Sequence, residues 1–189
     1  MTDMMQRLGL EHRNMSRLLT VLEQQLTVFE RGEHPDYDIL QAAADYFTGF
    51  PDRCHHPKED MILNHIRARD PAAAERVGDL EAEHRTLAKL ANDFRTTVEQ
   101  VLQEAELPRT VFADSLRGFI EAQRAHMQSE RAGFFLIAEA VLTPDDWTAL
   151  DAAASDEADP LFGGPEAAAY EALREQILSW QEEDETSAH

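Results

Sequence analysis

The stretch HHPKED, residues 55–60, shows which face of its helix is buried and what that face carries. Within it, His55 and Glu59 are four residues apart. On an α-helix this spacing places an imidazole and a carboxylate on one face, one turn apart. The same pair recurs in the stretch HMQSE as His126 and Glu130. Two such pairs, far apart in the chain, predict that two helices meet around a shared polar site.

Two further histidines, His12 and His84, each lie in an EHR triplet inside an apolar helical repeat. The repeat around His12 consists of Leu8, Met15, Leu19, Leu22, Leu26 and Phe29. Its steps of three and four residues are typical of a helix packed in a bundle. His84 interrupts a similar repeat that runs from Val77 to Val101. Both histidines are therefore expected to face the core.

The apolar periodicity predicts four long helices, at about residues 3–31, 36–69, 71–104 and 109–142. Short connections between long helices are typical of an antiparallel up-down-up-down four-helix bundle. Pro51 and Pro57 predict a bend or break just before HHPKED, because each proline removes a backbone donor from the helix. The expected fold class is therefore all-α.

Additional helices are expected after the bundle. The stretch TPDDW, residues 143–147, offers a threonine N-cap and a proline at the first helical position, so a short helix to about residue 154 is predicted. An apolar face predicts a last helix at about residues 165–181. We divide the chain into a bundle domain, residues 1–142, and a C-terminal helical extension, residues 143–189, packed on the bundle.

Composition limits the class of protein. The 189 residues are 43% apolar and contain only eight glycines and eight prolines, as expected for a globular helical domain. The net charge of −20 argues against binding to nucleic acid or to an anionic membrane surface. No apolar run is long enough for a membrane span and no signal peptide is visible, so a cytoplasmic protein is expected.

Each predicted long helix contributes one histidine to its apolar face, and two of them add a glutamate one turn later. In an up-down bundle these residues all fall toward one end. Burying each of them without a partner would cost about 1–3 kcal/mol. A single histidine on an apolar face is more often a hydrogen-bonded core residue than a ligand, but four at matching depths with two glutamates favour a metal centre. The candidate ligands are His12, His55, Glu59, His84, His126 and Glu130.

Mixed imidazole and carboxylate donors suit iron, manganese or zinc. Two glutamates can bridge two ions and leave two histidines for each, which predicts a dinuclear centre with ions about 3.5–4 Å apart. Structural zinc closes at four ligands without a bridging pair, so iron is preferred.

Other polar residues near these positions have weaker patterns. His56 is rotated about 100° from His55 on a helix, so it is expected at the surface or in contact with a ligand residue. His65 lies beside the stripe as an alternative fifth ligand, and Cys54 is expected to pack in the core or, alternatively, to offer a thiolate. Acidic residues that flank the histidines are expected to be solvated, although one of them can accept a ring N–H. They are Glu11, Glu81 and Glu83.

In chain order the motifs read H, HxxxE, H, HxxxE, and over about residues 8–141 the sequence resembles the hemerythrin-type, or HHE cation-binding, family. The resemblance implies an antiparallel four-helix bundle. It also implies two non-haem iron ions, bridged by oxo or hydroxo groups and by carboxylates, with the six candidate residues as ligands.

Oxygen-carrying hemerythrins have an HxxxH pair on the third helix, whereas this chain has Ala88 one turn after His84. Reversible oxygen carriage is therefore not expected. The six-ligand pattern is similar to family members linked to iron–sulfur cluster repair, which usually carry a further cysteine-containing N-terminal domain, and to a peroxide-decomposing branch. The expected function is binding or redox processing of oxygen, nitric oxide or peroxide. The alternatives are a catalase-like enzyme and a non-enzymatic sensor or iron–sulfur repair protein.

Overall fold

The computed structural model describes residues 2–103, 106–154, 159–161, 170–171 and 173–175. No residue in these ranges is in a β-strand, which confirms the all-α prediction. Two of the helical elements are π-helical turns, η1 and η2. The elements are α1 (Asp3–Glu30), α2 (Tyr37–Phe50), η1 (Pro51–His55), α3 (His56–Arg69), α4 (Pro71–Val77), α5 (Leu80–Leu102), α6 (Arg109–Ser129), η2 (Glu130–Phe134), α7 (Phe135–Val141) and α8 (Pro144–Ala153).

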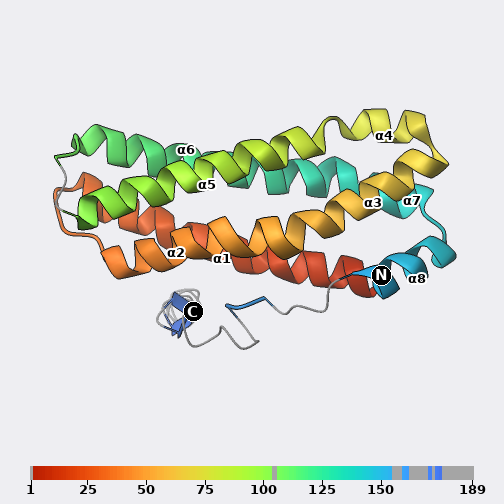
Figure 1. Ribbon diagram of the computed structural model, residues 1–189, viewed down its shortest axis with the longest axis horizontal. Helices are drawn as coiled ribbons and strands as arrows, with labels where there is room; N and C mark the ends of the chain where they lie inside the picture. The colour runs from red at the N-terminus through yellow and green to blue at the C-terminus, as the bar shows by residue number, and fades with distance from the viewer. Residues whose placement is uncertain (1, 104–105, 155–158, 162–169, 172, 176–189) are drawn as a thin grey trace, which may run out of the picture.

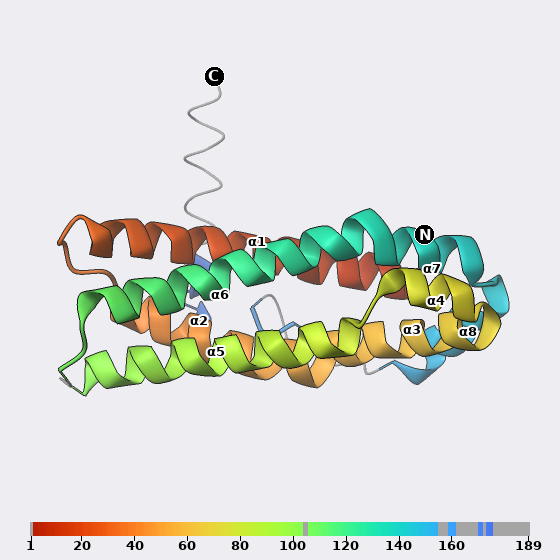
Figure 2. The same ribbon diagram turned by 90° about the horizontal axis from the view of Figure 1, so that it is seen from above.

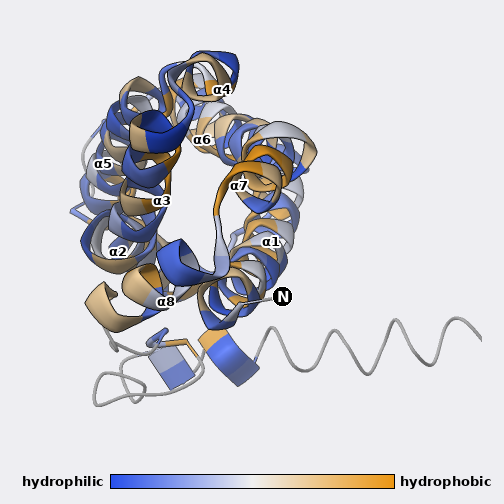
Figure 3. Ribbon diagram, turned by 90° about the vertical axis from the view of Figure 1, so that its right-hand side faces the viewer, coloured by the Kyte–Doolittle hydropathy of each residue, from blue (hydrophilic) through white to orange (hydrophobic). Residues whose placement is uncertain are grey.

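The long elements form a bundle of rods that run in alternating directions (Figures 1 and 2). The rods are α1, then α2–η1–α3, then α4 and α5, then α6–η2–α7. Helix α5 packs against both α2 and α6, and α1 packs against α6. Seen from one end, the rods surround a common interior (Figure 3). The arrangement is that of the predicted up-down-up-down bundle.

The buried apolar residues form two clusters along this interior. One cluster includes Met15, Phe50, Ala91 and Phe119. The other includes Leu8, Ile62, Leu80, Phe134 and Trp147. On every rod, the candidate ligands fall in the sequence between a residue of one cluster and a residue of the other. The bundle therefore presents one polar layer between two apolar layers.

The second rod departs from α-helical geometry at the position where the prolines predicted a break. Helix α2 ends at Phe50, and a π-helical turn follows in which the His56 N–H donates to the Pro51 carbonyl, five residues back. Neither Pro51 nor Pro57 has an N–H to donate, so the regular α-helical ladder is interrupted on both sides. A second π-helical turn, η2, begins at Glu130 without a proline and was not predicted. Both turns lie beside candidate ligands.

The predicted third helix, residues 71–104, is divided into two. Helix α4 ends at Val77, and the next residue, Gly78, has a φ of 88° and a ψ of −160°, outside the helical region. The side chain of Asp79 then accepts from the Ala82 N–H and starts α5. The apolar repeat continues in phase across the break, which is why the sequence predicted one helix.

Helix α8 follows the bundle, and Thr143 and Asp146 form a reciprocal capping box at its start. Its Trp147 and Leu150 join the second apolar cluster, and Asp151 accepts a hydrogen bond of 2.8 Å from the Met4 N–H. Most of the predicted last helix, residues 165–181, lies outside the described residues. None of the helices that the structure describes is both long and apolar enough to cross a membrane.

The break at Gly78 generates a prediction. Alanine at Gly78 should lower the free energy of unfolding by about 1–3 kcal/mol, because this region of φ and ψ is almost restricted to glycine. Alanine at Gly49, inside α2, is the matched control and should stabilise by about 0.5–1 kcal/mol. A Cβ at either position meets nothing within 4 Å, so the two differ in backbone conformation alone. Urea denaturation followed by circular dichroism measures both, and equal effects would contradict the prediction.

Candidate metal centre

The polar layer brings all six predicted ligands together. The Nε2 atoms of His12 and His55 are 3.0 Å apart. Glu59 directs Oε1 to His55 Nε2 at 3.2 Å and Oε2 to His84 Nε2 at 3.3 Å. One carboxylate thus connects the pair formed by His12 and His55 to the opposite side of the layer.

Glu130 makes the same connection from the fourth rod. Its Oε2 lies 3.2 Å from His12 Nε2, and its Oε1 lies 3.0 Å from His126 Nε2. Each glutamate therefore has one oxygen toward the His12 side and the other toward the side of His84 and His126. This is the arrangement that two bridging carboxylates between two cations require.

The carboxylates of the layer are deeply buried, and only histidine ring nitrogens approach their oxygens in the contacts described above. Glu59 and Glu130 are 0% and 1% exposed, and among the described residues none donates a hydrogen bond to any of their four oxygens. The Nε2 atoms of His84 and His126 are also without a hydrogen-bond partner in the described part of the chain. Buried polar atoms in native proteins normally have a hydrogen-bond partner. The convergence of several oxygen and nitrogen atoms without one therefore fits a bound cation.

A carboxylate lies behind three of the histidines, and those behind His55 and His126 hydrogen-bond to the ring. A ligand histidine typically has its second ring nitrogen held by a carboxylate, which fixes the ring and the tautomer. The contacts are His55 Nδ1 to Glu11 Oε2 at 2.7 Å, His126 Nδ1 to Glu83 Oε2 at 3.0 Å, and His84 Nδ1 to Asp60 Oδ1 at 3.2 Å. In each case Nε2 is left facing the other members of the layer.

Glu11 was expected to be solvated or, alternatively, to accept a ring N–H, and the alternative is the one found: it contacts His55 Nδ1, is 3% exposed and also pairs with Lys58, which is 2% exposed. Burial raises the pKa of Glu11, but the contacts and charges of His55 and Lys58 outweigh burial and lower this pKa overall. The sequence contained one indication that Lys58 is buried, because it lies between His55 and Glu59, which were both expected to face the core. Of the other flanking acids, Glu83 is half exposed and contacts His126, and Glu81 pairs with Arg67 at 3.6 Å.

His56 was expected at the surface or in contact with a ligand residue, and the second alternative is the one found: it is only 5% exposed and lies in the layer. Its ring stacks on that of His84, with centroids 4.1 Å apart and planes 11° apart. Its Nδ1 lies 3.0 Å from Asp52 Oδ1. The expectation assumed α-helical phase, whereas the π-helical turn before His56 changes that phase and turns two consecutive histidines inward.

Two overlapping groups of side chains can therefore hold a cation. In each group, one potential ligand atom per residue lies within 4.8 Å of all the others. The groups are His12, His55 and Glu59, and His56, Glu59, His84 and His126. His65 belongs to neither, because its Nδ1 contacts its own helix at Met61 O, 3.0 Å away. Cys54 is buried in the first apolar cluster.

Without a metal, protons bound to the histidines compensate the negative charge of the two glutamates in the layer. Burial lowers the pKa of His55, but Glu59 and Glu11 outweigh it and raise this pKa to about 10. Burial likewise lowers the pKa of His84, and contacts with Glu130 and Glu59 raise it to about 9. Burial and the charge of Glu59 raise the pKa of Glu130, yet its contacts with three histidines bring it to about 2.

His56 behaves differently, because burial and the charges of His84 and His55 lower its pKa. A neutral imidazole has a lone pair available for a cation. The layer therefore combines ionised carboxylates with imidazoles that either carry a displaceable proton or carry none.

A buried layer of imidazoles and carboxylates inside an antiparallel helical bundle defines the class as a cation-binding bundle protein. The model of the hemerythrin HHE cation-binding domain matches residues 3–138, and the chain belongs to this family. No curated protein and no solved structure gave a significant match. Membership and the buried cluster together establish a metal-binding protein, for which iron is the typical metal of the family.

The Glu11–Lys58 pair generates a prediction about stability. Lys58→Met should lower the free energy of unfolding of the metal-free protein by about 3 kcal/mol, because it removes one of the two cations that compensate the buried Glu11 carboxylate and leaves only protonated His55 beside it. The control is Lys89→Met, which removes the other lysine of the chain. Lys89 pairs with Asp93 at the surface, where its side chain is 73% exposed, so its loss should have little effect. Equal urea midpoints for the two variants would contradict the prediction.

The raised histidine pKa values generate a prediction about pH. In the metal-free protein, protonated His55 and His84 contribute to the free energy of unfolding. This contribution is fully present below their ordinary pKa of 6.5 and is lost as pH rises through about 9 for His84 and about 10 for His55. A metal displaces these protons, so the metal-loaded protein does not undergo that loss. The difference in Tm between loaded and metal-free protein should widen from pH 7 to pH 9 and shrink on acidification. Calorimetry that shows a constant difference would contradict this.

Proposed function

We propose that the protein is a non-haem di-iron protein that binds or redox-processes oxygen, nitric oxide or peroxide. The observation that carries this proposal is the orientation of Glu59 and Glu130, each with one carboxylate oxygen toward either side of the layer. The proposed ligands are His12, His55, Glu59, His84, His126 and Glu130. Two iron ions held there would supply electron transfer to or from a small ligand.

The residues of the chain have separate roles in this proposal. The two carboxylates neutralise the charge of the cations, and the buried histidines supply neutral donors of intermediate softness. Glu11 and Glu83 hold the rings of His55 and His126 in place through Nδ1, and Asp60 lies close to Nδ1 of His84. The apolar clusters on both sides of the layer keep bulk water away from it.

His56 is proposed as a seventh ligand, on the side of His84 and His126. Its position in the second cation group and its lowered pKa support this role. The two sides then differ, with three histidines on one and two, His12 and His55, on the other. The expectation against reversible oxygen carriage rested on a missing fifth imidazole at Ala88. His56 supplies a fifth imidazole from α3, so Ala88 does not decide between carriage and turnover.

A catalase-like activity is the second candidate, and the buried chain from Lys58 through Glu11 to His55 favours it. Decomposition of peroxide requires transfer of protons to and from the reacting oxygen atoms. Glu11 and Lys58 can exchange protons with His55, which is part of the layer. Steady-state oxygen evolution from peroxide by the iron-loaded protein separates this candidate from a binding or sensing role.

The proposed centre is tested by its stoichiometry and by coupling between ions. Metal analysis after anaerobic loading with ferrous iron should approach two irons per chain. Mössbauer spectra of the oxidised protein should show spin-coupled ferric ions, since shared carboxylates place the ions close together. One iron per chain, without coupling, would refute the di-iron proposal.

The role of His56 is tested by alanine substitution. His56→Ala should weaken iron binding at one of the two positions by about 10- to 100-fold and should change the Mössbauer parameters of that ion alone. His65→Ala, on the same helix but outside both cation groups, is the matched control and should retain two irons. If both variants load iron with the affinity of the unchanged protein, His56 is not a ligand.

A further inference from the structure

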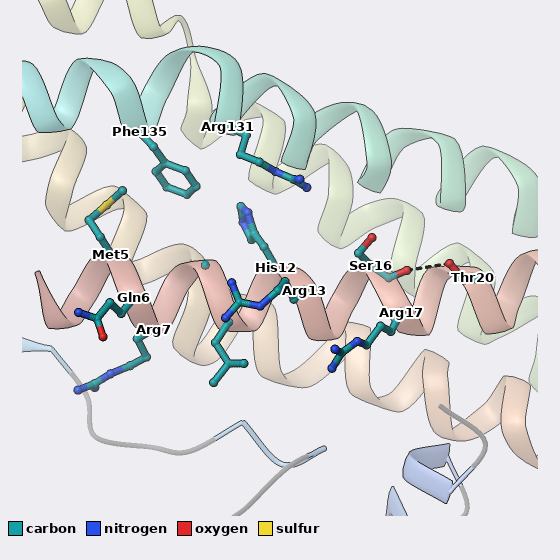
Figure 4. A pocket seen from close by; sticks show the side chains of 12 residues that line it. Met5, Gln6, Arg7, His12, Arg13, Ser16, Arg17, Thr20, Arg131 and Phe135 are labelled. Atoms are coloured by element: carbon teal, nitrogen blue, oxygen red, sulfur yellow. Dashed lines mark hydrogen bonds between the residues drawn. The ribbon is translucent and has the colours of Figure 1, made fainter. Parts of the chain in front are cut away.

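A groove of about 870 Å³ runs along α1 on the outside of the bundle, facing the fourth rod. Figure 4 shows residues of α1 on one wall and Arg131 and Phe135 on the other. The ring of His12 rises between the two walls (Figure 4). His12 is 3% exposed, and its Nε2 lies in the polar layer, 3.0 Å from His55 Nε2. The groove therefore leads from solvent to one side of the proposed metal centre.

The charge of this groove is opposite to that of the protein. Four of the chain's 17 cationic side chains are among its lining residues, and no aspartate or glutamate is. The arginines are Arg7, Arg13, Arg17 and Arg131. Within the described part of the chain, the last three make no ion pair with a carboxylate. In a protein with a net charge of −20, such a surface locally attracts anions.

A second approach to the layer has the opposite character. A pocket of about 320 Å³ beside α3 and α5 reaches His56 and His84. Three carboxylates line it, those of Asp52, Asp60 and Glu81, against one arginine, Arg85. An anion is repelled there, whereas a metal cation is attracted. The two faces of the centre are thus separated by charge.

We propose that the arginine groove is the entry route by which small anions reach the metal on the side of His12 and His55. This inference rests on the proposed di-iron function and adds to it the side of entry and the charge of the ligand. His12 and His55 form the side with fewer protein donors, so an external ligand has room there. The groove is lined by four arginines and by no carboxylate, so it selects by charge. Azide, superoxide and the anion of hydrogen peroxide share the required chemistry.

The two EHR triplets of the sequence supply a matched pair of variants. Arg13 follows His12 and lines the groove, whereas Arg85 follows His84 and lines the acidic pocket. Both side chains are exposed, so their replacement leaves the core intact. The test compares Arg13→Gln/Arg131→Gln with Arg85→Gln, after iron content and Tm have been checked for each.

The probe is azide, mixed in a stopped-flow instrument with the oxidised, iron-loaded protein at low ionic strength. The groove variant should bind azide about tenfold more slowly, and the difference should vanish at high salt, where charges are screened. Arg85→Gln should bind azide at about the rate of the unchanged protein, because Arg85 lies outside the groove. Nitric oxide is neutral, so the rate at which it binds to the reduced protein should be the same for the groove variant, Arg85→Gln and the unchanged protein.

Each outcome distinguishes the two proposals. If the chain takes up no iron, the proposed function fails and this inference fails with it. If all proteins carry two irons and the groove variant binds azide as fast as Arg85→Gln, the function stands and the entry route is wrong. Equal slowing for azide and nitric oxide would also overturn the inference, because it would show that the arginines shape the passage rather than attract charge.

Discussion

The structure depends on compensation of two buried carboxylates. Glu59 and Glu130 lie between two apolar clusters, with no hydrogen-bond donor to their oxygens among the described residues. Ionised carboxylates in such surroundings require a nearby positive charge. Protonated histidines provide it in the metal-free protein, and a metal provides it when bound. Folding, metal affinity and pH are therefore coupled through one layer of side chains.

Departures from α-helical geometry occur at this layer. The π-helical turns begin at Pro51 and at Glu130, each within or beside a His-x-x-x-Glu pair. Such turns are often found at functional sites because they change the direction of side chains that a regular helix would point elsewhere. Here the first of them brings His56 into the layer beside His55. The position of a fifth imidazole is thus a consequence of backbone geometry.

The surroundings of the centre are electrically asymmetric. Arginines of α1 and η2 line the groove beside His12, whereas two aspartates of the second rod and one glutamate of the third line the pocket beside His84. The net charge of the chain hides this difference, because the acidic residues are spread over all the rods. In the proposed centre, the side with fewer histidine ligands is also the side with the cationic approach. Both features favour the same place for an external ligand.

The sequence by itself determined the helices, the bundle and the six candidate ligands, because helical periodicity is a local property and every one of those residues interrupts an apolar repeat. Only the tertiary structure decided the break at Gly78, the burial of Glu11 with Lys58, and the inward position of His56. The first depends on one backbone conformation that the continuing repeat conceals. The others depend on the phase of a π-helical turn and on contacts between different rods, which no local spacing encodes.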